Sequence, residues 1–269
     1  MDFTELGLSE KTIKAIVDAG MTTPTTVQAD VIPSILAGKD VFTIAPSRCG
    51  KTCSYVLPLI DIISRREVKN ILIITASSKQ SVSVSDRFAV FNKCHEVNEN
   101  TVTNSDEAID DEANVIIASP NLLVDLMKED KADLSAVDIL VIDDINLIKK
   151  LHQLKNLQII LDALPEKRQN IIYTNRRSKE KQSILDKILQ TPAEIKVDRA
   201  KEAEADAELE NKNSEKITTA DKTQNEHKQK IVENPHDYEA VSLMKRYRTF
   251  GRKTPEFLLT KVELVEDEG

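Results

Sequence analysis

The segment from Ala45 to Thr52 has the residue types and spacing of a phosphate-binding loop. It reads Ala-Pro-Ser-Arg-Cys-Gly-Lys-Thr, follows a short apolar run and precedes a stretch with helical character. Backbone N–H groups at the start of a helix point into such a loop and favour an anion. The Lys51 ammonium would bind the β and γ phosphates of a nucleotide, and the Thr52 hydroxyl would bind Mg²⁺. The alternative is a Gly-Lys-Thr turn without function.

The residues inside this loop, Ser47, Arg48, Cys49 and Gly50, would lie against the phosphates of a bound nucleotide. A cysteine at a helix N-terminus can become a reactive thiolate, whereas the alternative for Cys49 is a small filler. The three cysteines of the chain lack the paired spacing of a zinc site and the density of a disulfide framework. We therefore expect reduced thiols.

A second polar element ends another apolar run, at residues 141–146, which read Val-Ile-Asp-Asp-Ile-Asn. Its adjacent acids, Asp143 and Asp144, would project from the carboxyl edge of a sheet, beside the phosphate loop. P-loop enzymes hold Mg²⁺ through an aspartate at this place. The alternative is an exposed strand-to-helix turn in which Asp144 is the N-cap.

The elements that must position these residues alternate along the chain. Runs rich in isoleucine and valine predict buried strands at residues 40–45, 70–75, 114–118, 138–142 and 170–174. Helical spacing lies between them, as at residues 147–161 and 184–189, and two helices come first, after Ser9 up to Gly20 and after Pro24 up to Gly38. The alternation predicts an α/β fold of the P-loop NTPase kind, with a parallel sheet covered by helices on both faces.

Composition divides the chain near Asp198. Residues 1–197 predict the α/β domain, and residues 198–236 are so rich in charged and small residues that we expect a solvated, disordered linker. Residues 237–269 regain apolar side chains and form with the linker a charged C-terminal extension. In this last segment five cations surround Tyr247 and Phe250. They predict either a small docking element with a solvated charged face or an RNA-binding patch.

Length and charge narrow the function classes. A chain of 269 residues with 40% apolar content can build a real core. It has no apolar run near the ~20 residues that span a bilayer and no leader pattern, so we expect a cytoplasmic protein that does not interact with membranes. The formal net charge is -8, so any contact with RNA would have to be local.

Residues outside the loop follow a wider pattern, which comprises Phe3, Gly20, Pro24, Gln28 and Lys51. These spacings resemble the Q motif and the P-loop of the DEAD-box RNA helicases, and residues 141–146 lie where that family has Asp-Glu-Ala-Asp. The resemblance covers residues 1–197. It implies the first recA-like domain of such a helicase, the domain that binds ATP.

The resemblance also implies a cofactor and its contacts. ATP or ADP would bind with Mg²⁺, and Gln28 would contact the adenine, with Phe3 and Thr23 near the base. Lys51 and Thr52 would hold phosphate and the metal.

The remaining implied residues lie at the other strand end. Asp143 would hold Mg²⁺ through a water molecule, and Asp144, with Lys51, would act in catalysis. Asp144 stands where the family has a glutamate and is one methylene shorter, so an attacking water would sit about 1 Å out of reach. Asn146 replaces the last aspartate of the motif, which removes a charge from the link that couples ATP to RNA.

Arg48 is a departure within the phosphate loop, because the family has glycine there. A residue with a side chain forced to positive φ costs ~1–2 kcal/mol. Its side chain would also crowd or fill the place of a phosphate. We therefore expect weakened ATP binding.

The segments that contact RNA in the family differ further. Residues 76–81 and 119–122 put Ser78 and Leu122 where the family has arginines, and the Gly-Gly pair between these segments is not found. Residues 174–176, Thr-Asn-Arg, stand where the family has Ser-Ala-Thr. We therefore expect weak RNA binding at most.

No segment after Asp198 resembles the second recA-like domain, which supplies arginine fingers that contribute ~10³–10⁵ in rate. The first hypothesis is a degenerate domain that binds nucleotide weakly and serves as an interaction or regulatory module. The second is an active RNA-dependent ATPase, a hydrolase completed by a partner protein that supplies a second recA-like domain. The third is a scaffold without nucleotide. The retained Gln28, Lys51 and Asp143 favour the first.

Overall fold

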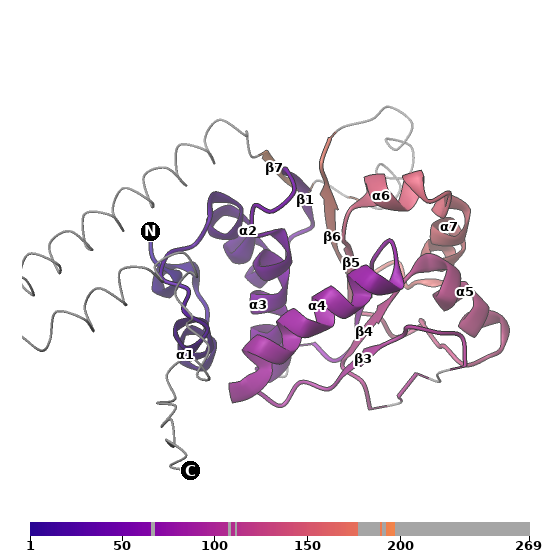
Figure 1. Ribbon diagram of the computed structural model, residues 1–269, viewed down its shortest axis with the longest axis horizontal. Helices are drawn as coiled ribbons and strands as arrows, with labels where there is room; N and C mark the ends of the chain where they lie inside the picture. Colours follow the sequence, from indigo (N-terminus) through magenta and orange to yellow (C-terminus); the bar gives the residue numbers. More distant parts are fainter. Residues whose placement is uncertain (66–67, 107–108, 111, 177–188, 190–191, 197–269) are drawn as a thin grey trace, which may run out of the picture. The chain divides into compact units, whose positions relative to one another are not determined.

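A single sheet organises the part of the chain that the computed structural model describes, which is residues 1–65, 68–106, 109–110, 112–176, 189 and 192–196. Within these residues, seven strands pair in the order β3-β4-β2-β5-β6-β1-β7, and every pair is parallel (Figure 1). The strands are β1 (Val41–Ile44), β2 (Ile71–Ile74), β3 (Glu99–Thr101), β4 (Val115–Ala118), β5 (Ile139–Ile142), β6 (Gln169–Thr174) and β7 (Ala193–Lys196).

Five of these strands were predicted from their apolar runs, with ends that agree within one residue. The edge strands β3 and β7 were not predicted. β3 reads Glu-Asn-Thr and β7 reads Ala-Glu-Ile-Lys, and no residue in either strand is fully buried. Strands at the edge of a sheet need no continuous apolar run, so the signal that reveals the central strands is missing there.

The helices are α1 (Glu10–Asp18), α2 (Thr26–Leu36), α3 (Lys51–Ser64), α4 (Ser78–Phe91), α5 (Pro120–Lys128), α6 (Ile145–Lys150) and α7 (Leu154–Ala163), with short 3₁₀ turns η1 (Phe3–Leu6) and η2 (Asn92–Cys94). The predicted starts and stops are confirmed for the first two helices. Ser9 caps α1 by accepting from the Thr12 N–H, and Gly20 and Gly38 have positive φ angles of 77° and 69° just after α1 and α2.

The stretch at residues 147–161, predicted as one crossover helix, is two helices instead. α6 ends at Lys150 and α7 begins at Leu154, and His152 between them has a φ of 59°. The Gln153 N–H donates to the Ile148 carbonyl across this turn, at 3.1 Å. Apolar spacing continues through the turn, and the left-handed residue is not a glycine, so periodicity alone gives no sign of the break.

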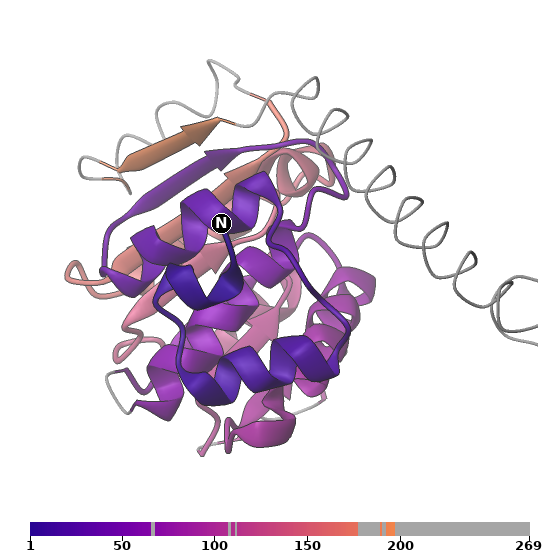
Figure 2. The same cartoon turned by 90° about the vertical axis from the view of Figure 1, so that its left-hand side faces the viewer.

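Helices cover both faces of the sheet, as predicted. Alternate residues of each strand enter opposite cores, so Val41 packs with residues of α1 to α4 and Phe42 packs with residues of α5 to α7. Figure 1 shows α5, α6 and α7 grouped apart from α1 to α4, and Figure 2 shows β7, in orange, beside β1 at the edge. The loops at the strand ends are thereby held between two rigid layers.

Several predictions fall outside the described residues. These are most of the helix at 184–189, the linker at 198–236 and the segment at 237–269 with its charged patch. Where the structure describes the chain, none of the helices combines the length and the apolar character needed to cross a membrane.

Candidate nucleotide-binding site

The loops that carry the predicted chemistry meet at the carboxyl edge of the sheet. β1 leads into the loop that begins at Ala45, and β5 leads into Asp143. β6 lies between β1 and β5 and ends at Thr174. Because the carboxyl ends of parallel strands share one edge, the three loops are neighbours. Residues 76–81 follow β2 and residues 119–122 follow β4 at the same edge.

The loop after β1, residues 45–50, is the one that the sequence predicts to bind phosphate, and it is called the phosphate loop below. Gly50, with a φ of 85°, is the N-cap of α3, which begins at Lys51. The Lys51 Nζ donates to the Ala45 carbonyl oxygen at 3.3 Å, so the ammonium lies across the loop. The Cys49 side chain is buried and its Sγ donates to the Pro46 carbonyl at 3.1 Å. This contact favours the filler interpretation of Cys49 over a reactive thiolate.

Arg48 adopts the conformation that a glycine would take more easily. Its φ is 72°, in the left-handed region, and its side chain is exposed. An L residue there costs ~1–2 kcal/mol, so the loop keeps its shape at an energetic cost. Ser47 is also exposed, and Thr52 in the first turn of α3 is half-buried.

The predicted adenine-contacting residue, Gln28, lies directly behind this loop. Its Oε1 accepts from the Thr25 N–H at 3.0 Å, which completes a capping box at the start of α2. Its Nε2 lies 3.4 Å from the Gly50 carbonyl, and the Thr25 hydroxyl donates to the Cys49 carbonyl at 3.0 Å. Thr25 and Gln28 therefore fasten α2 to the phosphate loop, and the adenine contact of Gln28 stays a prediction.

Gly50→Ala is expected to lower the free energy of unfolding more than Gly38→Ala. Both positions have positive φ, at 85° and 69°. A Cβ on Gly50 would also lie 2.7 Å from the Gln28 Nε2 and 2.9 Å from the Thr25 Oγ1, whereas Gly38 has open space around it. We expect an extra loss of about 1–3 kcal/mol from this crowding. Urea unfolding of both variants measures it, and equal losses would contradict the packing seen here.

The two other residues predicted near the base lie in different surroundings. Phe3, in η1, is only 2% exposed and packs in the hydrophobic core, so its ring faces do not stand open to a stacking base. Thr23 is exposed, two residues before the N-cap of α2. A contact between Phe3 and adenine would require the start of the chain to move.

Asp143 is a buried carboxylate held by two side chains. Its Oδ2 accepts from the Gln80 Nε2 at 3.0 Å and from the Tyr55 hydroxyl at 3.3 Å. Burial raises the pKa of the Asp143 carboxyl, while the hydrogen bond from Gln80 and the nearby Lys51 ammonium oppose the rise. The other oxygen, Oδ1, accepts no hydrogen bond from the described part of the chain, so its lone pairs are available to a ligand.

This arrangement fits Mg²⁺. A magnesium ion takes oxygen ligands in an octahedron and keeps several of its waters. The Thr52 hydroxyl would be a direct ligand, and the Asp143 Oδ1 would accept from a metal-bound water while Oδ2 remains held by Gln80 and Tyr55. Such outer hydrogen bonds orient a carboxylate towards a metal. When bound, the ion would neutralise charge on the phosphates.

Asp143→Asn is expected to stabilise the fold at neutral pH. A carboxyl whose folded pKa is raised contributes stability while it is protonated, and this stability is lost as pH rises from the unfolded value of 3.8 through the folded pKa. An amide does not ionise, so the variant avoids the loss, which is about 1.4 kcal/mol for each tenfold change in the acid dissociation constant between the unfolded and folded states. Urea unfolding at pH 7 and near pH 3.5 tests this. A variant that is less stable at pH 7 would contradict it.

Asp144 caps the helix that follows it. Its φ is 71°, and its Oδ1 accepts from the Asn146 and Leu147 N–H groups at 3.1 and 3.3 Å. The structure therefore confirms the N-cap interpretation of Asp144. To act as a catalytic base, the Asp144 carboxylate would have to accept a proton from a water molecule while it also accepts the two backbone N–H groups of α6.

Comparison with known proteins adds a decisive observation. Residues 25–176, more than half of the chain, match the family model described as DEAD/DEAH box helicase. The chain belongs to this family.

Relatives of known name agree with this assignment. The chain is 27% identical over 201 residues to the DEAD-box ATP-dependent RNA helicase RhpA of Helicobacter pylori, covering 72% of the chain and 41% of the relative. It is 27% identical over 205 residues to the ATP-dependent RNA helicase SrmB of Escherichia coli, covering 72% and 46%. The chain thus matches less than half the length of these relatives.

A solved structure supports the fold. The crystal structure of a DEAD box protein from the hyperthermophile Methanococcus jannaschii superposes with a TM-score of 0.69 at 22% identity, covering 74% of this chain and 56% of that one. The recA-like fold predicted from the sequence is confirmed. The described domain is therefore an RNA helicase-like ATP-binding domain of the DEAD/DEAH box family.

The family's link between the acidic motif and β6 is built from an amide here. The Asn146 Nδ2 lies 2.5 Å from the Thr174 Oγ1 and 2.5 Å from the Asn175 Oδ1, and 3.2 Å from the Arg176 carbonyl. Losing the charge of an aspartate has therefore not broken the contact between α6 and the end of β6. The sequence predicted the loss of a charge at this position, and the neutral Asn146 side chain makes the contact instead.

The two segments that the resemblance places at RNA, residues 76–81 and 119–122, are ordinary strand-to-helix turns. Ser77 caps α4, and the Ser78 hydroxyl donates to the Thr103 carbonyl at 3.3 Å. Leu122 is partly buried and packs against the core beneath α5. Neither Ser78 nor Leu122 offers a cation to a nucleic acid backbone.

Sequence reasoning missed Tyr55 and Gln80, which hold Asp143. Tyr55 lies in an otherwise apolar run of α3 and is fully buried, with its ring centroid 5.4 Å from that of Tyr173. Gln80 also accepts from the Ala76 N–H at 3.1 Å. A hydroxyl inside a buried helix and an amide in the first turn of α4 were the available signals, because each needs a partner at the same sheet edge.

Proposed function

We propose that this domain binds ATP or ADP with Mg²⁺ and works as a nucleotide-dependent interaction or regulatory module without unwinding RNA by itself. The observation that carries the proposal is that the Lys51 ammonium acts electrostatically on the Asp143 carboxylate, from the loops after β1 and β5, which flank the end of β6. A cation for phosphate and a carboxylate for a metal-bound water then face one space. We also propose that the domain ends near residue 197, followed by a linker at 198–236 and a separate segment at 237–269.

Each residue has a stated role in this proposal. Backbone N–H groups at the start of α3 and the Lys51 ammonium bind the phosphates, and Thr52 and Asp143 hold the metal. Gln28 is joined to Gly50 through its Nε2. A nucleotide base bound beside Gln28 would therefore be read by the same side chain that fastens the phosphate loop.

Two features support a module that lacks autonomous activity. Asp144 is already engaged as an N-cap, and Arg48 holds a strained conformation in the phosphate loop. Ser78 and Leu122 lie where RNA-binding arginines were expected from the resemblance. RNA binding is therefore proposed as weak, and we propose that a second recA-like domain supplied by a partner protein would be needed for activity.

Calorimetric titration tests the proposal directly. ATP, ADP and GTP are titrated with and without Mg²⁺, and we expect saturable adenine nucleotide binding that weakens when the metal is removed. GTP should bind more weakly, because a bidentate amide contact to adenine discriminates by ~1–3 kcal/mol in comparable base readout. If no nucleotide binds at millimolar concentration, the scaffold hypothesis replaces this one. If ATP and GTP bind alike, Gln28 does not read the base.

A further inference from the structure

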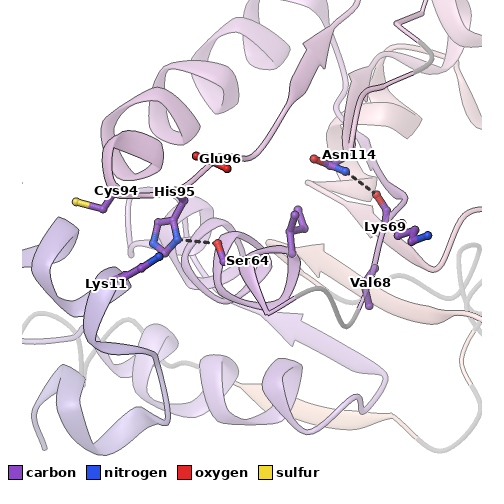
Figure 3. Close-up of a pocket in the computed structure, with 9 residues that line it drawn as sticks. Lys11, Ser64, Val68, Lys69, Cys94, His95, Glu96 and Asn114 are labelled. Carbon is purple, nitrogen blue, oxygen red and sulfur yellow. Dashed lines mark hydrogen bonds between the residues drawn. The ribbon is translucent and has the colours of Figure 1, made fainter.

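A cavity of about 500 Å³ lies at the amino edge of the sheet, away from the phosphate loop. It is open to solvent on one side and is lined by residues of α1, the end of α3, the turn after η2 and the segments that precede β2 and β4. Figure 3 shows these lining residues. Its volume falls within the ~300–1,000 Å³ of small-molecule sites. Ile63 and Val68 give it an aliphatic wall, and Lys11, Lys69, His95 and Glu96 give it charge.

His95 is fixed in this cavity by both ring nitrogens. Its Nδ1 lies 2.6 Å from the Ser64 hydroxyl, and its Nε2 lies 3.2 Å from the Thr12 hydroxyl. The Ser64 hydroxyl lies 2.8 Å from the Ile60 carbonyl oxygen, and the Thr12 hydroxyl donates to the buried Asp61 carboxylate at 2.7 Å. The Thr12 hydroxyl gives its proton to Asp61, so the His95 Nε2 donates to the Thr12 oxygen. The single Ser64 proton can go to the Ile60 carbonyl or to the His95 Nδ1. The ring is neutral when Ser64 donates to Nδ1, and it is an imidazolium when Nδ1 donates to Ser64.

The surrounding charges oppose this protonated form. Burial lowers the pKa of His95, the Asp61 carboxylate acts in the opposite direction, and the Lys11 ammonium lowers the pKa further. Asp61 is itself paired with Arg65, whose guanidinium nitrogen is 2.5 Å from its Oδ2. The hydrogen-bond partners of the ring thus accommodate both states, and burial with the nearby Lys11 disfavours the charged one.

The lysines of the lining leave it with an excess of positive charge, which Glu96 offsets only in part. Neither the Lys11 nor the Lys69 ammonium forms an ion pair or a side-chain hydrogen bond with any residue in the described ranges, in a chain whose net charge is -8. With His95 protonated, these three cations and the Glu96 carboxylate leave the lining with two net positive charges. Cys94, at the rim, is a free thiol.

We propose that this cavity binds a small organic phosphate, with its anionic group between Lys11 and His95 and its carbon skeleton against Ile63 and Val68. A phosphate monoester carries about -1.5 to -2 charge at neutral pH, and this charge would stabilise the protonated form of His95, which gives the lining its two net positive charges. Lysine is a common point-charge ligand for phosphate. His95 contributes charge and not a hydrogen bond, since its nitrogens are occupied.

Binding is coupled to a proton in this proposal. An anion beside Lys11 removes the repulsion between the ammonium and the imidazolium, so it favours the charged ring. Conversely, protonation of His95 strengthens the binding of a phosphate of given charge, while the phosphate itself gains a proton and loses charge below about pH 6. Glu96 opposes the anion at every pH at which its carboxyl is ionised.

The test uses NMR of the histidine side chains in the full chain with Lys51→Ala, which removes the phosphate loop as a second anion site. Inorganic phosphate and glycerol phosphate are the probes, and sodium chloride controls for ionic strength. His152, exposed between α6 and α7, is an internal reference. We expect saturable shifts of the His95 resonances and a higher titration midpoint for His95 with phosphate bound.

Matched variants complete the test. Lys11→Ala should weaken the apparent affinity about tenfold or more, whereas Lys14→Ala, on the same helix but outside the cavity lining, should leave it unchanged. A phosphate response of His95 that matches that of His152, or one that Lys11→Ala leaves intact, would overturn the proposal. Because Lys51 is absent throughout, these outcomes do not depend on whether the domain binds nucleotide at the carboxyl edge.

Discussion

Lys51→Ala is expected to remove measurable nucleotide binding while the fold stays intact. Hydrogen bonds to charged groups contribute ~1.5–3 kcal/mol each, so losing the ammonium from two phosphates weakens binding about 100-fold or more. The fold should not suffer, because the described contact of the Lys51 Nζ is one 3.3 Å hydrogen bond to the Ala45 carbonyl. Calorimetric titration with ATP and Mg²⁺ measures the affinity, and urea unfolding measures the stability.

Lys39→Ala is the matched control for this loss. Lys39 is exposed and lies just before β1, at the opposite end of the strand that leads to the phosphate loop. It carries the same charge but cannot reach the site, so its removal should leave the affinity for ATP unchanged. Equal affinity of Lys51→Ala and the parent chain would remove the phosphate assignment altogether. Equal weakening by both variants would show that net charge, and not the loop, attracts the nucleotide.

The central part of the fold could be predicted because its signals are local. Val41–Ile44 and Ile139–Ile142 are short apolar runs, and Ser9 and Gly20 mark the bounds of a helix without reference to anything distant. β7 could not be predicted, since an edge strand with exposed Glu194 and Lys196 has no such run. Its existence depends on backbone pairing with β1, which no pattern within the segment encodes.

The site was predictable to the same extent. Lys51 and Asp143 follow apolar strands, and parallel strands bring their ends to one edge, so their proximity follows from topology. The hydrogen bonds of Tyr55 and Gln80 to Asp143 join α3 and α4 to the end of β5, over separations of 88 and 63 residues. Such contacts depend on how helices pack on the sheet, which is a property of the whole core.

The spacing from Thr25 to Gln28 has two interpretations, one structural and one functional. The spacing Thr25 to Gln28 fits both a capping box and the family's Q motif. The structure shows the capping box and the contact to Gly50. A capping role does not exclude adenine, because an amide has two donors and two acceptor lone pairs. A preference for ATP over GTP would therefore show that Gln28 contacts adenine in addition to capping α2.

The 269-residue chain by itself is expected to release phosphate from ATP only at a slow background rate, even with saturating RNA. Arginine fingers contribute ~10³–10⁵ in rate in related enzymes, and the chain matches less than half the length of RhpA and SrmB. Asp144 is one methylene shorter than glutamate, and its carboxylate already caps α6. An attacking water would therefore lack both a well-placed base and stabilisation of the transition-state charge.

These losses act on different steps, so restoring one should not restore turnover. Arg48→Gly relieves a left-handed residue at φ 72° and opens the phosphate loop, which should strengthen nucleotide binding. Asp144→Glu lengthens the base but keeps a carboxylate at the N-cap of α6. The double variant should therefore gain affinity by a larger factor than it gains turnover, because no arginine finger is added and the γ-phosphate stays open to water.

Steady-state phosphate release at saturating ATP and RNA tests this prediction. It is measured for the parent chain and the double variant, and Lys51→Ala gives the background rate. Protein concentration is varied in each series. Parent turnover near ~1 s⁻¹ that does not depend on concentration would contradict the prediction and identify a working ATPase. Turnover that appears only as concentration rises would mean that a second copy completes the site, because an intermolecular arginine finger must obey mass action. Slow release at every concentration leaves binding, and not hydrolysis, as the chemistry that this domain performs alone.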